Sequence, residues 1–314
     1  MDKFDNLIDA VKSYVESVEI SSIDDIMLML KTTDIILKEK DFHFVAKYKN
    51  KCSLSKCNSL VEEFLLSLNP KYLDYYKMRK SDGTVYFDYS SDAEPPHSCY
   101  DYENNKRCIY IPITNTIEDA FSIVHELFHD INMGEEEDSY GRYFFTESLS
   151  YLGEILFSEF LSSKDIADAK NVIINDLYYL KKKALEVNFN LRLIGEYLLN
   201  GYLDKLSITD IILSYPQKYF DDVMEFVYII SNEEELTLEE EETYVLSSLV
   251  ATYMYDRIKK NKKYIDELFD LNEVLNDYSL SQVLDYLDLD YDDFKLTDES
   301  YNILRSKYKK FIKR

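Results

Sequence analysis

The pattern of apolar and polar positions predicts a chain of helices interrupted by one short stretch of β-strands. Residues 4–76 have a helical pattern, as in Ser59–Leu68, where apolar residues recur every three or four positions before Asn69 and Pro70 end the segment. With 6 glycines and 5 prolines in all, the chain contains few helix breakers. Further segments with helical spacing are Phe145–Leu161, Asp165–Lys183, Leu238–Lys260 and Ser300–Ile312.

Between the two helical parts, residues 84–113 have the composition of strands. Thr84–Tyr89, Cys99–Tyr102 and Arg107–Ile113 are rich in β-branched and aromatic residues, and Glu103–Lys106 has the character of a turn. We therefore expect a small antiparallel sheet that contains a hairpin. Pro112 indicates that the last strand ends there or lies at an edge. The predicted fold class is mainly α.

A helix that carries candidate chemistry follows the strands. Thr116–Asp119 has the pattern of a capping box with Asp in the Glu position, and Gly134 is a natural C-terminal cap. Inside this helix, His125–His129 spells H-E-x-x-H. Because histidines four positions apart lie on one helical face, both imidazoles can reach one metal ion. Glu126 points to a different side, where it can act as the general base of a zinc peptidase.

A carboxylate that could complete the metal site follows 18 positions after His129. Glu147 lies in the next predicted helix, and two histidines with one glutamate form a zinc ligand set. Glu154, seven residues further on, shares a helical face with Glu147, so we expect it to orient a histidine. A purely structural acid is the alternative for Glu154. Three other candidates lack ligand spacing or lie in predicted loops: Glu135–Asp138, His43 and His97.

The composition of the chain mainly excludes certain binding partners and a membrane span. The net charge of −24 argues against binding to nucleic acid or to anionic membranes. No segment has the roughly 18–20 uncharged apolar residues of a membrane span, and the N-terminus lacks the apolar core of a signal peptide. We expect a soluble, cytoplasmic protein. We divide it into an N-terminal helical segment, residues 1–50, and a catalytic domain, residues 51–314, which could form one continuous domain.

The cysteines do not form a recognisable metal motif. Cys52, Cys57, Cys99 and Cys108 contain no C-x-x-C pair. Cys99 and Cys108 could face each other across the predicted hairpin. Because thiols stay reduced in the cytosol, we expect all four cysteines to be free.

The order of these motifs resembles the catalytic region of the thimet oligopeptidase and oligoendopeptidase F family. The resemblance rests on Cys99–Tyr102, Ile109–His129 and Phe145–Glu154, and it extends less specifically over residues 59–314. In that family a zinc-ligating Glu follows the H-E-x-x-H helix and a second Glu comes seven residues later. Glu147 and Glu154 occupy those places.

The resemblance implies a mainly helical, zincin-like oligopeptidase that binds Zn²⁺ and cuts short peptides in a deep channel. It also implies a sheet edge that aligns the substrate backbone by strand addition. Here that edge would be Arg107–Ile113, with four residues in contact with substrate: Cys108, Ile109, Tyr110 and Ile111.

The chain departs from the family pattern at several places. Phe128 replaces the usual Gly before the second histidine, and Asp130 stands where a small or apolar residue is usual. Family members are considerably longer, with an N-terminal helical half. They also have a downstream His and Tyr that steady the oxyanion, whereas no histidine follows His129. The remaining hydroxyl donors are tyrosines for which packing in a helix interface is the alternative: Tyr244, Tyr253 and Tyr255.

Three hypotheses follow. In the first, the chain is a zinc metallopeptidase in which His125, His129 and Glu147 hold zinc, Glu126 takes a proton from the attacking water, and a tyrosine supports the oxyanion. In the second, it is a catalytically inactive or weakly active zinc-binding relative that binds peptides or proteins. In the third, the two histidines make ordinary hydrogen bonds and no metal binds. The oligomeric state is not predicted.

Overall fold

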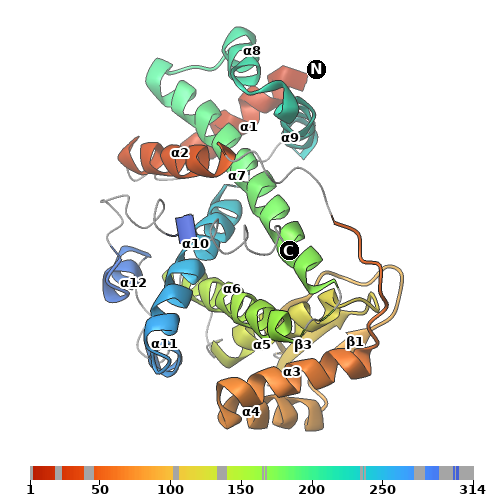
Figure 1. Ribbon diagram of the computed structural model, residues 1–314. Helices are drawn as coiled ribbons and strands as arrows, with labels where there is room; N and C mark the ends of the chain where they lie inside the picture. Colours follow the sequence, from red (N-terminus) through yellow and green to blue (C-terminus); the bar gives the residue numbers. More distant parts are fainter. Residues whose placement is uncertain are drawn as a thin grey trace. The chain divides into compact units, whose positions relative to one another are not determined.

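The computed structural model describes most of the 314-residue chain. The described residues are 3–17, 23–38, 46–101, 106–132, 140–164, 166, 168–233, 236, 238–271, 280–289, 300 and 302–303. They form a mainly helical fold, as predicted, with one small sheet (Figure 1). The helices are α1 (Lys3–Ser17), α2 (Ile23–Leu37), α3 (Leu54–Leu68), α4 (Pro70–Ser81), α5 (Glu118–Asn132), α6 (Tyr140–Ser163), α7 (Ala169–Asn200), α8 (Lys205–Ser214), α9 (Phe220–Glu233), α10 (Glu239–Lys260), α11 (Tyr264–Leu271) and α12 (Leu280–Tyr286), with a 3₁₀ turn, η1 (Gln217–Tyr219).

The chain divides into two compact units, which we describe separately. The first comprises Met1–His43 and Leu177–Val245, and the second comprises Phe44–Asp176 and Leu246–Arg314. Helices α7 and α10 each continue from one unit into the other. The division into a segment 1–50 and a domain 51–314 stays a prediction.

The first unit is a group of helices packed through apolar stripes. Leu7, Ala10 and Val11 of α1 are buried, and their spacing places them on one helical face. This helix packs against α9 and α8. Asp204 caps the start of α8, where its carboxylate accepts a hydrogen bond from the backbone N–H of Ser207.

The second unit begins with a pair of helices, α3 and α4, joined at one residue. Asn69 ends α3, and its side chain also accepts a hydrogen bond from the backbone N–H of Lys71 at the start of α4. Pro70 is the first residue of α4, a position where its missing N–H costs nothing. The predicted stop at Asn69 and Pro70 is therefore correct, and the same residues start the next helix.

The sheet consists of β1 (Val85–Asp88), β2 (His97–Asp101) and β3 (Lys106–Pro112), with β3 in the centre. Strands β2 and β3 pair antiparallel with Cys99 opposite Cys108, which confirms the predicted hairpin; its turn, residues 102–105, lies outside the described residues. Strand β1 pairs with β3 in parallel, so the sheet is mixed. Parallel pairing requires a long connection between strands, and residues 89–105 provide it here.

Cys99 and Cys108 form a disulfide across the hairpin, so the expectation of four free thiols is wrong for this pair. Their opposite positions in the antiparallel register bring the two sulfur atoms together. Cys52 and Cys57 are free and buried, with their sulfur atoms 3.3 Å apart.

The start of α5 is fixed by hydrogen bonds close to the predicted pattern. The hydroxyl of Thr116 accepts from the backbone N–H of Glu118 at 3.2 Å. The carboxylate of Asp119 reaches back and accepts from the backbone N–H groups of Thr114 and Asn115. These bonds satisfy donors near the start of the helix that carries the H-E-x-x-H motif. The predicted cap at Gly134 lies outside the described residues, as does most of Ser300–Ile312.

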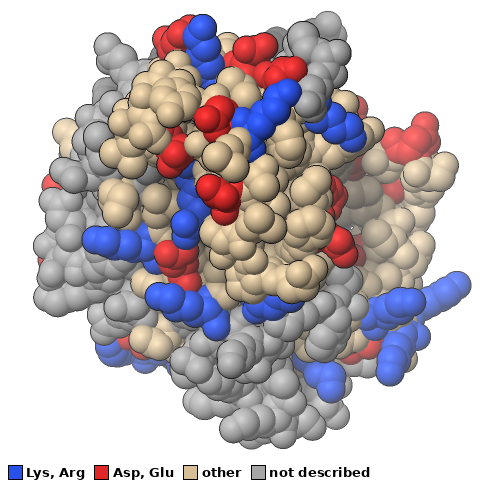
Figure 2. Space-filling model, turned by 90° about the horizontal axis from the view of Figure 1, so that it is seen from above, with Lys and Arg blue, Asp and Glu red and all other residues tan. Residues whose placement is uncertain are grey.

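The surface carries both kinds of charge. Figure 2 shows basic and acidic side chains interspersed on one face of the molecule. Within the described part of the chain, none of the helices combines the length and apolar character that a membrane span requires.

Candidate metal centre

Helix α5 presents two histidines on one face. His125 and His129 lie one turn apart, and their Nε2 atoms are 3.1 Å from each other. The face beside them is apolar, and three neighbours in the helix are fully buried: Ile123, Val124 and Leu127. Burial of this stripe fixes the rotation of α5 about its axis and thereby aims both imidazoles at one point.

Helix α6 brings a carboxylate to the same point. Helices α5 and α6 pack side by side (Figure 1). Glu147 is buried, and one of its oxygen atoms lies 3.2 Å from Nε2 of His129 while the other lies 3.7 Å from Nε2 of His125. Tyr143, one turn earlier in α6, also hydrogen-bonds to this carboxylate. The structure therefore brings together the three residues predicted as metal ligands.

A second carboxylate of α6 orients His125. The Nδ1 atom of His125 donates to an oxygen of Glu154 at 2.6 Å, which leaves Nε2 directed toward Glu147. Carboxylates commonly hold metal-binding histidines in this way. The geometry corresponds to the orienting role predicted for Glu154.

Electrostatics keep the cluster ionised in the absence of a cation. Burial alone would lower the pKa of His125, but the hydrogen bond and charge of Glu154, with the nearby Glu126 and Glu147, raise it to about 10. Burial would raise the pKa of Glu147, but His129, His125 and Tyr143 hold it below its ordinary value. The metal-free cluster thus contains a histidinium between carboxylates.

This arrangement predicts that the metal-free protein loses stability as the pH rises. The pKa of His125 lies above its ordinary value of 6.5, so its contribution is fully present below pH 6.5 and disappears as the pH passes about 10. Unfolding by urea in the presence of a chelator, repeated between pH 6.5 and 10, measures the effect. Glu154→Gln should flatten the dependence, and an equally steep dependence in that variant would contradict the assignment to His125.

The three side chains fit a metal ion. One ligand atom from each of His125, His129 and Glu147 lies within 4.8 Å of the others. The Oε2 atom of Glu147 is buried without a hydrogen-bond partner. A buried polar atom without a partner costs free energy, and a cation between the three side chains would remove that cost. Two imidazoles and one carboxylate are a donor set suited to zinc.

Glu126 is placed differently from the ligands. It is buried with only 5% of its surface exposed, and none of the described residues hydrogen-bonds to it. Its carboxylate oxygen atoms are nevertheless not fully buried, so they remain in contact with solvent. A carboxylate with free lone pairs beside the cluster can accept a proton from water.

Phe128, one departure from the family pattern, is accommodated by a glycine of α6. Phe128 is fully buried, and a Cβ atom added to Gly153 would lie 2.9 Å from Cδ1 of its ring. The absence of a side chain at Gly153 therefore provides the space for the ring. Because Glu154 follows Gly153, this contact also sets how closely α6 approaches His125.

The contacts described for the predicted tyrosines are with residues other than the three metal ligands. The hydroxyl of Tyr255 donates to Glu159 at 2.9 Å, and Glu159 is 12 residues beyond Glu147, about 18 Å along the axis of α6. Tyr253 accepts a hydrogen bond from Arg257 at 2.7 Å. Tyr244 lies in the other unit, where the ammonium of Lys183 packs over its ring. A catalytic role for any of them stays a prediction.

The predicted substrate-binding edge is wrong. Strand β3 is paired on both sides, so no peptide can add to it. Ile109 and Ile111 are fully buried, and Cys108 is in the disulfide. The hydroxyl of Tyr110 bonds to Asp88, and its ring stacks on His97 at 5.0 Å. The sequence could not reveal that β1 occupies the far side of β3, because that pairing is parallel and non-local.

Several residues at the site were missed from the sequence. Tyr151 packs edge-on against His125, with ring centroids 5.5 Å apart. Asp176 of α7 lies close enough to the site for electrostatic coupling: burial and the charges of Glu154 and Glu118 hold its pKa well above the usual range. The signal available for it was an acid that lies between the apolar residues Ile174 and Leu177 in a segment with helical spacing.

Several solved structures that are named as peptidases have the same fold. One from Chlamydophila abortus, assigned as a peptidase, has a TM-score of 0.65 and 15% identity, and the match covers 98% of this chain and 55% of that one. PZ peptidase A with an inhibitor has a TM-score of 0.62 and 14% identity, covering 96% and 58%. A protein assigned as oligoendopeptidase F from Bacillus anthracis has a TM-score of 0.57 and 11% identity, covering 97% and 56%.

These comparisons confirm the predicted family likeness at the level of the fold. The chain spans somewhat more than half the length of the peptidases it matches. No protein-family model matches the sequence, and no curated protein matches it.

Proposed function

We propose that this chain is a zinc-dependent peptidase that hydrolyses short peptides. The observation that supports this most strongly is the convergence of His125, His129 and Glu147 next to the unpaired carboxylate of Glu126. The fold is that of peptidases, which favours peptide hydrolysis over other zinc chemistry.

Each residue of the site has a defined task in this proposal. His125, His129 and Glu147 would hold the zinc, and Glu154 would fix the ring of His125 through the 2.6 Å hydrogen bond. When bound, zinc supplies Lewis acidity that polarises a peptide carbonyl and lowers the pKa of water. Glu126 accepts a proton from the attacking water at its carboxylate and donates it to the leaving amine.

The substrate backbone would align along β2. Because β3 is paired on both sides, the remaining edges of the described sheet are those of β1 and β2. Of these, β2 packs against α5, the helix that carries His125 and His129. An extended peptide added to His97–Asp101 would form main-chain hydrogen bonds beside the metal site.

The test is cleavage of a mixed pool of short peptides, with products identified by mass spectrometry. We expect the zinc-loaded protein to cleave, the chelator-treated protein to lose cleavage, and added zinc to restore it. Cleavage that persists in the chelator, or no cleavage by protein with bound zinc, would contradict the proposal.

A second function is favoured by the position of the tyrosines. Tyr255 and Tyr253 are engaged by Glu159 and Arg257, and no histidine follows His129. A protein without an oxyanion donor could bind peptides at a zinc-stabilised site without turning them over. Zinc would then raise the unfolding temperature while the peptides remain intact. Cleavage that depends on Glu126 would exclude this function.

Glu154→Gln should weaken zinc binding by about 10–100-fold, as is usual when a carboxylate that orients a metal-binding histidine is changed. A neutral amide keeps the size of the side chain but loses the charge that stabilises the Nδ1–H group of His125. Competition with a chelator measures the affinity. Glu159→Gln, on the same helix but bonded to Tyr255 and Lys259, is the matched control and should bind zinc normally.

A further inference from the structure

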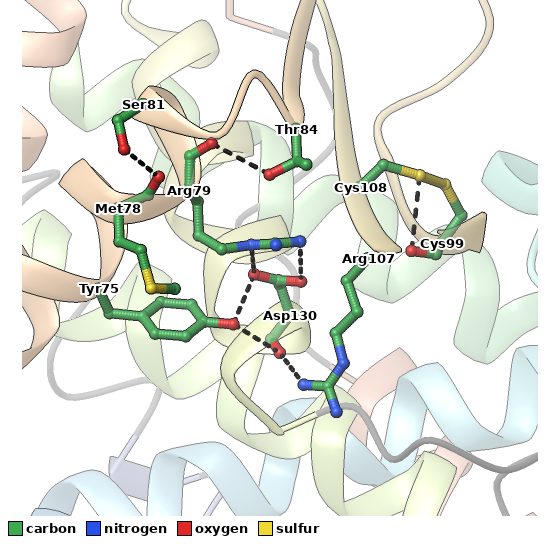
Figure 3. Close-up of polar contacts among 9 residues, drawn as sticks. All are labelled: Tyr75, Met78, Arg79, Ser81, Thr84, Cys99, Arg107, Cys108 and Asp130. Atoms are coloured by element: carbon green, nitrogen blue, oxygen red, sulfur yellow. Dashed lines mark hydrogen bonds and ion pairs between the residues drawn. A yellow bond between two sulfur atoms is a disulfide. The ribbon is translucent and has the colours of Figure 1, made fainter. Parts of the chain in front are cut away.

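Asp130 directly follows His129 and carries a fully buried carboxylate. Arg79 of α4 binds it through two parallel hydrogen bonds, from Nε at 2.8 Å and from Nη2 at 3.0 Å. The hydroxyl of Tyr75, also on α4, donates to the same carboxylate at 2.9 Å. Figure 3 shows these side chains converging on Asp130.

The backbone of the same residue is held from the sheet. Arg107 of β3 donates from Nη1 to the carbonyl oxygen of Asp130 at 2.9 Å (Figure 3). Residue 130 is therefore fixed at its side chain by α4 and at its main chain by β3. We call Tyr75, Arg79 and Arg107 the Asp130 clamp.

The Asp130 clamp contributes more to the relative position of α4 and α5 than to the free energy of unfolding. A carboxylate in the last turn of a helix is unfavourable because the carbonyl ends there carry negative charge. The cation of Arg79 compensates this effect and also the cost of burying the charge of Asp130. Buried ion pairs, however, contribute little net stability compared with apolar residues of the same volume. What the bidentate pair provides is a fixed direction and distance between α4 and the end of α5.

We propose that the Asp130 clamp positions the metal ligand His129. Asp130 is adjacent to His129 in the last turn of α5, so the clamp sets the rotation of that turn. It thereby keeps Nε2 of His129 3.2 Å from Glu147. Tyr75, Arg79 and Arg107 are positioning residues in this role, since none is a ligand. The inference rests on the metal site of the proposed function.

The test compares zinc affinity with the stability of the zinc-free protein. Arg107→Gln removes a half-buried side chain and its bond to the Asp130 carbonyl, and Arg79→Lys keeps the charge but loses the two-bond geometry. We expect both to weaken zinc binding by about 10–100-fold in competition with a chelator. Arg107→Lys, which can still donate to the carbonyl, should recover part of the loss.

Lys80→Met is the matched control. Lys80 follows Arg79 in α4, and its ion pair at 3.0 Å is with Glu62 of α3. Its loss should leave zinc affinity unchanged. The unfolding temperature of the zinc-free protein separates positioning from folding: the inference requires that affinity falls in Arg107→Gln while this temperature stays close to that of wild type.

Three results would overturn the inference: unchanged zinc affinity in Arg107→Gln, a fall in affinity matched by loss of zinc-free stability, or a wild-type protein that binds no zinc. Wild-type protein that binds zinc but cleaves no peptide would contradict only the proposed function. The affinities of the variants would still decide whether the clamp positions His129.

Discussion

Replacing Glu126 by Gln is expected to lower the rate of peptide cleavage by about 10²–10⁴-fold while zinc stays bound, which is the usual contribution of a general base. Glu126 is not a member of the ligand group formed by His125, His129 and Glu147, so it is not needed to hold the ion. The amide of Gln has nearly the same shape but cannot accept the proton of the attacking water. The expected change is therefore confined to the chemical step.

The measurement combines cleavage rates on one peptide with zinc content determined on the same samples. Glu62→Gln is the control, since it makes the same change on α3, where the residue pairs with Lys80. It should cleave at a rate near that of wild type. Full activity in Glu126→Gln would rule out Glu126 as the base.

Replacing Phe128 by Ala is expected to lower the free energy of unfolding by about 3–5 kcal/mol, the usual cost of removing a buried aromatic ring. Gly153→Ala should cost about 1–3 kcal/mol, because the added methyl group would lie 2.9 Å from the ring of Phe128. The double variant should be less destabilised than the sum of the two, because the new methyl group occupies part of the space that the ring leaves.

Urea unfolding of the zinc-free variants tests this, with Gly195→Ala of α7 as the control. A Cβ atom at Gly195 meets nothing within 4 Å, so this change should stabilise the helix by up to about 1 kcal/mol. If the loss of unfolding free energy in the double variant equals the sum of the losses in Phe128→Ala and Gly153→Ala, the two residues are not coupled.

Local patterns in the sequence predicted most of the elements. The helical spacing of α3, α5 and α6 and the turn between Tyr102 and Arg107 were sufficient for the helices and the hairpin. The two histidines followed from the period of one helix, and the spacing of Glu147 and Glu154 on another placed both acids toward the same side. These features depend on contacts within an element or between consecutive elements.

Features that depend on distant parts of the chain could not be predicted. The parallel pairing of β1 made β3 the central strand and invalidated the predicted edge. Asp130 looked only like a departure from a pattern, because its partner Arg79 lies 51 residues earlier. Nothing in the sequence distinguished among 29 tyrosines. The structure places Tyr143 beside Glu147 and Tyr151 beside His125, and neither was among those chosen.

The packing of Phe128 against Gly153 also restricts the routes by which this sequence can evolve. A chain with Gly at 128 and a larger residue at 153 could fill the same volume, so a large and a small residue can exchange places between α5 and α6. Changing 128 first leaves a void, and changing 153 first creates a clash. An exchange of the large and the small residue between positions 128 and 153 therefore requires either a less stable intermediate or simultaneous changes at both positions. Distant homologues on either side of such a step would share the metal ligands while differing at the residue between them.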